Sequence, residues 1–241
     1  YKEVNTQELK AGDFIPSTFT ESNLDFDVEG VRHGFVFGDG TLYNKKSGNT
    51  LSKVAFCGDK VEIFKYFDGV LSPSNYLHGL PSYYKELPDK CSSKEYLLGF
   101  IIGPVASDGV VSKSGVVIKH VDKGVLVQIV EIVSSLGMLP SLNSVNRDTN
   151  FKTNSTLYSL NIPKSCFKLE WLLRDFHKDR FGDKRTNPKS WKVVGLERTG
   201  LVDDVYCLQV EGEYKEFTLK GVILTGNCKG CLKAGGAGYW N

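Results

Sequence analysis

The chain has 241 residues, a formal net charge of +2 and 41% hydrophobic residues. This composition is sufficient for a sizeable buried core and excludes a disordered tail. The small net charge excludes binding of nucleic acid through bulk charge, so any such contact must come from a local basic face.

Composition also indicates where the protein works. No apolar run reaches the roughly 18 residues of a membrane span, and the first residues lack the apolar core of a signal peptide. Six cysteines are too sparse for a disulfide scaffold in a chain of this length and indicate a reducing compartment. We therefore expect an intracellular, cytoplasmic protein with no membrane contact. Because the chain does not begin with Met, we expect it to be a piece of a longer protein.

The first third of the chain mixes short strands with polar connections. A turn at residues 11–13 leads into a short strand that Pro16 ends, and residues 17–29 are linker-like. An apolar run over 31–37 comes next. The pattern then predicts two strands, a short helix and a proline-rich connector with little regular structure, at residues 41–45, 50–57, 60–67 and 72–91.

From residue 95 onwards the elements are clearer. An apolar run over 95–109 is followed by a strand pair, a helix, two strands and an amphipathic helix, at residues 110–121, 125–136, 142–146, 156–162 and 164–177. This order is α-ββ-α-ββ-α. The segment before residue 228 is predicted to contain only strands, at residues 191–197, 205–210, 217–219 and 222–224.

The two apolar runs that end in Asp-Gly form an internal repeat. Residues 32–40 align without gaps on residues 101–109, and each copy has a glycine, a helical stretch and then Asp-Gly. We interpret the repeat as a pair of packed helices, in which Gly34 and Gly103 allow the two backbones to approach closely. Pro104 lies inside the second helix, where it removes a backbone hydrogen bond and favours a kink.

The acidic residues at the two helix ends, Asp39 and Asp108, are then brought next to each other. Two carboxylates at close range raise each other's pKa unless a cation lies between them. Mg²⁺ is the natural cation for oxygen ligands, and paired metal sites hydrolyse phosphodiesters by in-line attack. The alternative is that each copy is a core helix ended by the glycine that follows, Gly40 or Gly109, without a catalytic role.

This repeat resembles the motif of the LAGLIDADG homing endonucleases, and the resemblance covers residues 28–180. It implies pseudo-two-fold αββαββα repeats whose curved sheets form a saddle over the major groove of double-stranded DNA. It also implies that Asp39 and Asp108 bind Mg²⁺ and that each cuts one strand of a target site. Sheet residues read DNA in this family, through phosphates and base edges. The candidates in this chain are Lys45, Lys46, Lys53, Lys113, Lys119, Arg147 and Lys152. The first repeat is short, and its second strand pair and final helix are hard to find in the sequence.

The C-terminal segment resembles the last two sequence blocks of inteins, the self-splicing domains of the hedgehog/intein (Hint) fold. The matching residues are Val205–Val210, Glu216–Leu219 and Gly221–Cys228. Residues 9–16 resemble the intein stretch just before an endonuclease insertion, so the matches come in the order found in that family. In this resemblance Asn227 forms a succinimide and breaks the 227–228 peptide bond, and Cys228 is the nucleophile that accepts the N-terminal flank. The alternative for Gly-Asn-Cys is a turn with a buried thiol.

The splicing residues differ from the usual pattern at two positions. Gly226 stands where most inteins have a His, so proton transfer must come from elsewhere or be slow. Cys207 stands where the family often has Asp, and it is a base, a transient thioester carrier or a buried residue. The N-terminal nucleophile and the Thr-x-x-His block are not found, so we expect that this chain alone cannot splice. It is either the C-terminal part of a split intein, which needs an N-terminal intein fragment, or a truncated open reading frame. The C-x-x-C spacing of Cys228 and Cys231 is at most half of a zinc site.

These interpretations predict an α+β protein in which a LAGLIDADG endonuclease domain, residues 25–190, is inserted in a mostly β Hint domain. The predicted Hint segments are residues 1–24 and 191–227, and residues 228–241 are the C-terminal extein flank. The predicted activities are Mg²⁺-dependent double-strand DNA cleavage and autocatalytic peptide cleavage or trans-splicing. Two alternatives stay open: a DNA-binding domain that has lost catalysis, and a structural domain with two core helices.

Overall fold

The computed structural model describes residues 8–16, 24–147, 155–182, 190–197, 216–219 and 223–226. The chain divides into two compact units, one formed by residues 19–187 and the other by residues 1–18 with 188–241. Helices and strands are both present in the larger unit, whose architecture is α+β. Within the described ranges, no helix has the length and apolar character needed to cross a membrane.

The smaller unit contains two short antiparallel strand pairs. Strand β1 (Phe14–Pro16) pairs with β9 (Ser190–Lys192), and β10 (Glu216–Leu219) pairs with β11 (Ile223–Gly226). The expected strand over 191–197 is wrong beyond Lys192. Lys192 pairs with Phe14, the first residue of β1, and the residues before Phe14 form a turn, so β9 ends where its partner strand begins. The expected strand over 205–210 lies outside the described residues.

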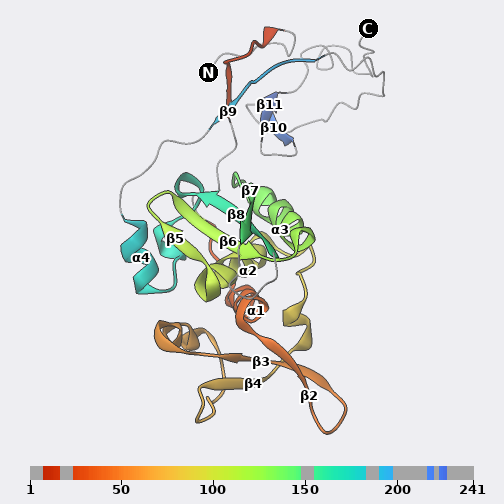
Figure 1. The fold of residues 1–241 in the computed structure, drawn as a ribbon, viewed down its shortest axis with the longest axis vertical. Helices are drawn as coiled ribbons and strands as arrows, with labels where there is room; N and C mark the ends of the chain where they lie inside the picture. Colours follow the sequence, from red (N-terminus) through yellow and green to blue (C-terminus); the bar gives the residue numbers. More distant parts are fainter. Residues whose placement is uncertain are drawn as a thin grey trace. The chain divides into compact units, whose positions relative to one another are not determined.

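The first half of the larger unit begins with α1 (Val28–Asp39) and continues into the three-stranded sheet β2-β3-β4 (Figure 1). The strands are β2 (Thr41–Asn44), β3 (Thr50–Ala55) and β4 (Tyr76–Leu80), with the 3₁₀ helices η2 (Gly58–Tyr66) and η3 (Ser82–Lys85) between and after them. The sequence prediction of an irregular connector over 72–91 is therefore wrong. Prolines flank β4 at positions 73 and 81, and this is tolerated because β4 is an edge strand that pairs only with β3.

The second half follows the predicted order α-ββ-α-ββ-α. Helix α2 (Lys94–Asp108) precedes β5 (Val110–Ser112) and β6 (Gly115–His120), and α3 (Lys123–Ser135) precedes β7 (Ser141–Arg147) and β8 (Ser155–Pro163). The sheet order is β5-β6-β8-β7. In the first half, the 3₁₀ helix η2 takes the place of a second α-helix, and a single strand, β4, follows it.

The predicted amphipathic helix over 164–177 is wrong. The chain forms the 3₁₀ turns η4 (Lys164–Cys166) and η5 (Leu169–Trp171), and helix α4 covers Asp175–Phe181. Four consecutive residues, 171–174, are buried. The 3₁₀ turns place Cys166, Phe167, Trp171, Leu172 and Leu173 in the core, so tertiary packing overrides the helical spacing of the apolar residues.

Helices α1 and α2 pack against each other between the two sheets (Figure 1). Their backbones are in direct contact: a Cβ added at Gly34 would lie 2.1 Å from the Phe100 carbonyl oxygen, and one at Gly103 would lie 2.3 Å from the Phe35 nitrogen. Helix α2 continues past Pro104 to Asp108. Pro104 has no N–H to donate to the Phe100 carbonyl four residues earlier, and this carbonyl faces the Gly34 backbone instead. The close helix contact predicted from the repeat is thus present.

Candidate active site

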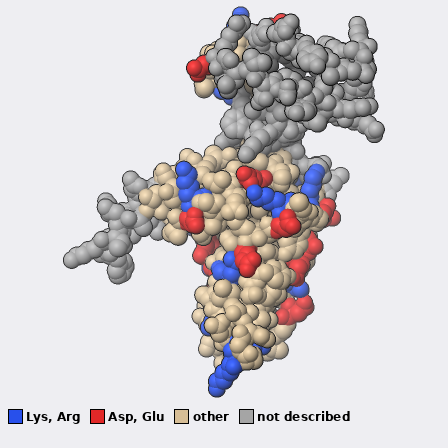
Figure 2. Space-filling model, turned by 90° about the vertical axis from the view of Figure 1, so that its right-hand side faces the viewer, with Lys and Arg blue, Asp and Glu red and all other residues tan. Residues whose placement is uncertain are grey.

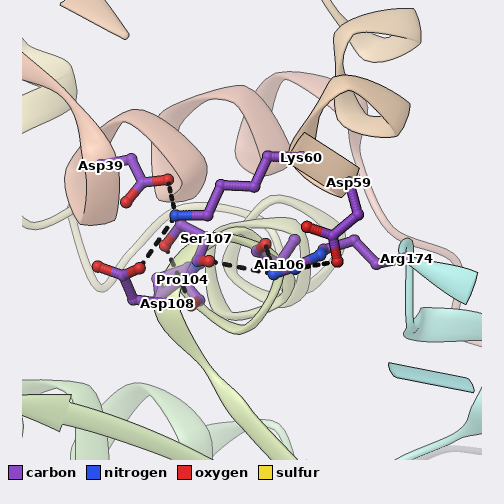
Figure 3. Close-up of polar contacts among 8 residues, drawn as sticks. All are labelled: Asp39, Asp59, Lys60, Pro104, Ala106, Ser107, Asp108 and Arg174. Carbon is purple, nitrogen blue, oxygen red and sulfur yellow. Dashed lines mark hydrogen bonds and ion pairs between the residues drawn. The ribbon is translucent and has the colours of Figure 1, made fainter. Parts of the chain in front are cut away.

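The two acidic residues of the repeat lie at the C-terminal ends of the paired helices, where α1 ends at Asp39 and α2 ends at Asp108. Each helix leads directly into a strand of its own sheet, through Gly40 and Gly109. The helix contact therefore brings the two carboxylates to one place, although they are far apart in the sequence (Figure 3). Their surroundings differ, because the side chain of Asp39 is 14% exposed and that of Asp108 is 76% exposed.

A lysine joins the two carboxylates. Lys60, in η2, donates from Nζ to Asp39 Oδ2 at 2.6 Å and to Asp108 Oδ1 at 3.0 Å (Figure 3). Burial alone would lower the pKa of Lys60, but its bonds to the two carboxylates raise the pKa, so the group stays an ammonium. The position between the carboxylates thus suits a cation.

The protonation of Asp39 is perturbed by this arrangement. Burial raises the pKa of Asp39, and the negative charge of Asp108 adds to the rise, whereas the hydrogen bond from Lys60 acts against it. A positive charge between two carboxylates favours their ionised forms. The Lys60 ammonium therefore favours the ionised form of Asp39 against the effect of burial.

The donor chemistry of this site fits a magnesium ion. Mg²⁺ is bound by one or two carboxylates together with waters and substrate phosphates, so that a dedicated protein cage is not required. Asp39 and Asp108 supply such a pair, and Lys60 already marks a place for positive charge between them. Over the described ranges, no group of three or more His, Cys, Asp and Glu side chains is arranged to hold a metal. Any metal bound here would consequently rely on water and phosphate for its other ligands.

A cation contacts the last turn of each helix: the buried Arg174 for α2 and the half-buried Lys85 for α1. Arg174 donates from Nη1 to the carbonyls of Ala106 at 3.2 Å and Ser107 at 3.3 Å, and its Nη2 forms an ion pair with Asp59 (Figure 3). Lys85 Nζ donates to the carbonyls of Val36 at 3.3 Å and of Phe37 at 2.5 Å. These carbonyls form the negative end of each helix dipole, which a cation stabilises.

The outer face of the first sheet combines a lysine with aromatic rings. Strand register places Lys53 opposite Thr41 and His78, while the neighbouring β3 side chains Ser52 and Val54 point to the core. The Lys53 ammonium lies 5.9 Å from the Tyr43 ring centre and 5.2 Å from that of Tyr76. Cation–π contacts hold this positive charge on an exposed surface.

The outer face of the second sheet is mainly neutral and polar. Val116 and Ile118 face the core opposite Ile162 and Leu160. Alternation then places the other set of residues on the outer face: Val117, Lys119, Ser141, Asn143, Ser159 and Asn161. Amide and hydroxyl side chains both donate and accept hydrogen bonds, which suits base edges more than phosphates.

The other predicted basic residues lie in turns and at strand ends. Lys45 and Lys46 are exposed in the β2–β3 turn, and Lys113 is exposed between β5 and β6. Figure 2 shows basic side chains at the lower tip of the molecule, where the β2–β3 hairpin lies in Figure 1, and a mixture of acidic and basic side chains elsewhere on that face. Arg147 ends β7, and Lys152 lies outside the described residues. The predicted lysines that the structure describes thus occupy separate places: Lys53 and Lys119 on the outer faces of the sheets, and Lys45, Lys46 and Lys113 in turns.

The predicted splicing residues can be placed only in part. Gly226 ends β11 and pairs with Glu216. Cys207, Asn227 and Cys228 lie outside the described residues. The roles of all four residues stay predictions.

Sequence reasoning missed three residues of the site: Lys60, Lys85 and Arg174. Lys60 lies in the 3₁₀ helix η2, which follows β3 after a short connection, and no local pattern linked it to the helix end. Lys85 reaches the end of α1 across 48 and 49 residues of sequence, and Arg174 reaches the end of α2 across 67 and 68. Both belong to segments whose structure was predicted incorrectly. No local pattern marks either of them.

The buried His177 is expected to make stability depend on pH. Burial lowers the pKa of His177 from its ordinary value of 6.5 to about 4, and Nδ1 has no hydrogen-bond partner in the described part of the chain. Below pH 6.5 the unfolded chain binds a proton that the folded chain excludes, so stability falls as the pH drops towards 4. We expect a loss of up to about 3 kcal/mol from this residue. Urea unfolding at several pH values measures the free energy of unfolding. Its decline towards low pH should be shallower in His177→Gln than in the wild type, and the same as in the wild type in His78→Gln, where the replaced residue is exposed.

Neither the family models nor the curated proteins contain a match to this sequence. Solved structures similar to the chain include those of the homing endonuclease I-DmoI. A variant of I-DmoI with its target DNA and Mg has 16% identity and a TM-score of 0.41, covering 56% of this chain and 88% of that chain. The complex of I-DmoI with DNA and Ca has 16% identity and a TM-score of 0.37, covering 56% and 82%. The complex with DNA and Mn has 17% identity and a TM-score of 0.38, covering 56% and 90%.

Proposed function

We propose that residues 19–187 form a site-specific, Mg²⁺-dependent double-strand DNA endonuclease of the LAGLIDADG homing type. The observation that carries this proposal is the carboxylate pair at the ends of two helices in backbone contact, with Lys60 between the two groups. A pair of core helices has no need of two acidic residues at the same place, since their mutual repulsion destabilises the fold. A phosphodiesterase needs such a pair to hold cations next to the phosphate.

In this proposal the chain's own residues position the DNA and the reacting groups. Asp39 and Asp108 would hold Mg²⁺, which when bound neutralises developing charge on a phosphate and makes a coordinated water a better nucleophile. Lys60, whose pKa the two carboxylates raise, would add positive charge next to the phosphates at this site. Lys53 and Lys119 neutralise phosphates from the outer faces of the two sheets, and Asn143 and Asn161 read base edges.

A second candidate function is DNA binding without cleavage. The observation that favours it is the pairing of Lys60 with both carboxylates, which already neutralises the site without a metal. In this case the sheet surfaces keep their role and the carboxylates are structural. The two candidates differ in one property, which is the effect of Mg²⁺ on bound DNA.

The experiment that separates these candidates uses the full chain and a library of randomised DNA duplexes. Bound duplexes are selected at low salt without metal, and Mg²⁺ or EDTA is then added. The proposed endonuclease cuts both strands with Mg²⁺ and neither strand with EDTA. Salt-sensitive binding without cutting would support the DNA-binding domain instead. Absence of salt-sensitive binding would contradict both and leave a structural domain.

We further propose that the segments flanking this unit belong to the C-terminal part of an intein. The pairing of β1 with β9 supports it, because it joins the two chain segments that lie on either side of the larger unit in the sequence. In this proposal the side-chain amide nitrogen of Asn227 attacks its own carbonyl carbon, forming a succinimide and freeing the amine of Cys228. Gly226 and Cys207 would lie near this reaction, and an N-terminal intein fragment would be the partner for trans-splicing.

The mass of the intact chain tests this splicing proposal. After incubation with thiol at neutral pH, with and without a candidate N-terminal fragment, we expect release of residues 228–241 from the wild type. Replacing Asn227 by Ala should abolish the release, because the attacking amide is lost. A release of these residues that persists in the Ala variant would exclude cyclisation of this asparagine.

A further inference from the structure

Arg174 joins two elements of the candidate active site that are distant in sequence. Its side chain is buried, with 8% of the residue exposed. One guanidinium nitrogen donates to the last-turn carbonyls of α2, and the other forms an ion pair with Asp59 (Figure 3). The residues on both sides of this bridge are immediate neighbours of the site: Ser107 precedes Asp108, and Asp59 precedes Lys60.

The geometry of the guanidinium suits this bridge. Arginine presents its donors in a rigid planar fork, whereas the ammonium of a lysine is a single point from which donors radiate. A guanidinium can therefore hold two carbonyls on one side and a carboxylate on the other at fixed separation. The separation fixed here is that between the end of α2 and the start of η2, the elements that carry Asp108 and Lys60.

The burial of a charge at this position has an electrostatic reason. Helices α1 and α2 converge with their negative dipole ends and their carboxylates together, which is repulsive. Lys85 contacts the last turn of α1 as Arg174 contacts that of α2. Burial lowers the pKa of Lys85, and the negative charge of Asp39 opposes this effect. Each helix end thus has a cation of its own, and of these two cations Arg174 also binds the start of the segment that carries Lys60.

We propose that Arg174 is a positioning residue, which sets the place of Lys60 relative to Asp108 by binding Asp59 and the end of α2 at once. This inference rests on the proposed endonuclease function for its catalytic consequence. The position of the Lys60 ammonium relative to Asp108 does not depend on that function, and it can be measured in the absence of DNA and metal. Arg174 itself does not touch either carboxylate of the pair in these contacts.

Three variants of the full chain test the inference. Arg174→Lys keeps the charge but loses the fork, and Asp59→Asn removes only the ion pair at a position whose side chain is 40% exposed. Lys164→Met is the matched control: this buried lysine donates to the carbonyls of Phe181 and Gly182 at the end of α4 and has no contact with the carboxylate pair. Thermal unfolding of all three variants shows whether each one folds.

The first measurement is the Mg²⁺ dependence of cleavage. We expect Arg174→Lys and Asp59→Asn each to raise the Mg²⁺ concentration needed, or to lower the rate, by roughly 10- to 100-fold, as is typical for residues that orient metal ligands. The double variant should be little worse than either single one, because both changes break the same link. Lys164→Met should cut like the wild type. A purely structural role would lower the unfolding temperature of the variants without this shared, non-additive change.

The second measurement is the hydrogen exchange of the Lys60 ammonium by NMR, without metal and DNA, with the signal assigned by its loss in Lys60→Met. An ammonium held by two carboxylates exchanges slowly, and we expect faster exchange or loss of the signal in Arg174→Lys and Asp59→Asn. If the wild type does not cut DNA, the proposed function fails, and this measurement alone decides the positioning role. Unchanged exchange in both variants would overturn the inference, whatever the cleavage result.

Discussion

Replacing Asp39 by Asn is expected to reduce Mg²⁺-dependent cleavage of one DNA strand by roughly 1,000-fold while DNA binding is kept. Asn has nearly the same shape but lacks the charge that holds a metal. A factor of this size corresponds to about 4 kcal/mol of transition-state stabilisation, within the several kcal/mol that a catalytic cation supplies. Replacing Asp108 by Asn should have the same effect on the other strand. Duplexes with each strand labelled separately would show nicked products in both variants.

A matched control for these variants is Asp68→Asn. Asp68 is also paired with a cation, Arg32, but its side chain is 89% exposed and the pair lies away from the two helix ends. The Asp68→Asn variant should cut both strands like the wild type. Normal cutting by both Asp39→Asn and Asp108→Asn would exclude the carboxylate pair as the metal site. A loss of DNA binding in these variants would mean that they had lost the fold and not only the charge.

The second large effect is expected for stability, at the contact between the two helices. Replacing Gly34 by Ala should destabilise the chain by about 3 kcal/mol or more, at the upper end of the cost of overpacking a core. The new Cβ would lie 2.1 Å from the Phe100 carbonyl oxygen and 2.8 Å from Pro104 Cδ. Neither neighbour is the free end of a flexible side chain, so the helices must move apart. Urea unfolding measures the loss, which should be accompanied by weaker cleavage because Asp39 and Asp108 separate.

Gly124→Ala serves as the reference for this measurement. Gly124 also lies in a helix, α3, but it is exposed, and an added Cβ would meet only Asp122 Oδ1 at 3.2 Å. The free energy of unfolding of the Gly124→Ala variant should stay within about 1 kcal/mol of the wild type, since alanine has a higher helix propensity than glycine. A similar small effect of Gly34→Ala would show that the helices are not in backbone contact.

The centre of the fold could be predicted from the sequence because it is encoded locally. The gapless repeat gives two helices with glycine at the same position and an acidic residue at the same end. Helical periodicity then determines which face of each helix carries the glycine, and only glycine permits the contact observed. The place of Asp39 and Asp108 follows from these two facts alone.

The rest of the candidate site depends on contacts that no local pattern encodes. Lys60 and Arg174 reach the helix ends from segments that are remote in sequence. The region around Arg174 has apolar residues at helical spacing, yet four consecutive side chains are buried and the chain turns instead. Strand β4 was missed for a related reason: prolines on both sides indicate a loop unless the strand is known to lie at a sheet edge.

The backbone contact between α1 and α2 separates two properties that evolve independently in an enzyme of the proposed kind. The distance between the two points of cleavage is determined by main-chain atoms at the glycine positions, which have no side chains to vary. In such an enzyme, recognition would depend on residues such as Lys53, Asn143 and Asn161, which lie on the outer faces of the sheets. Substitutions there can change the DNA sequence that is chosen without moving the cuts, so the ends left on the broken DNA should stay the same while targets diverge.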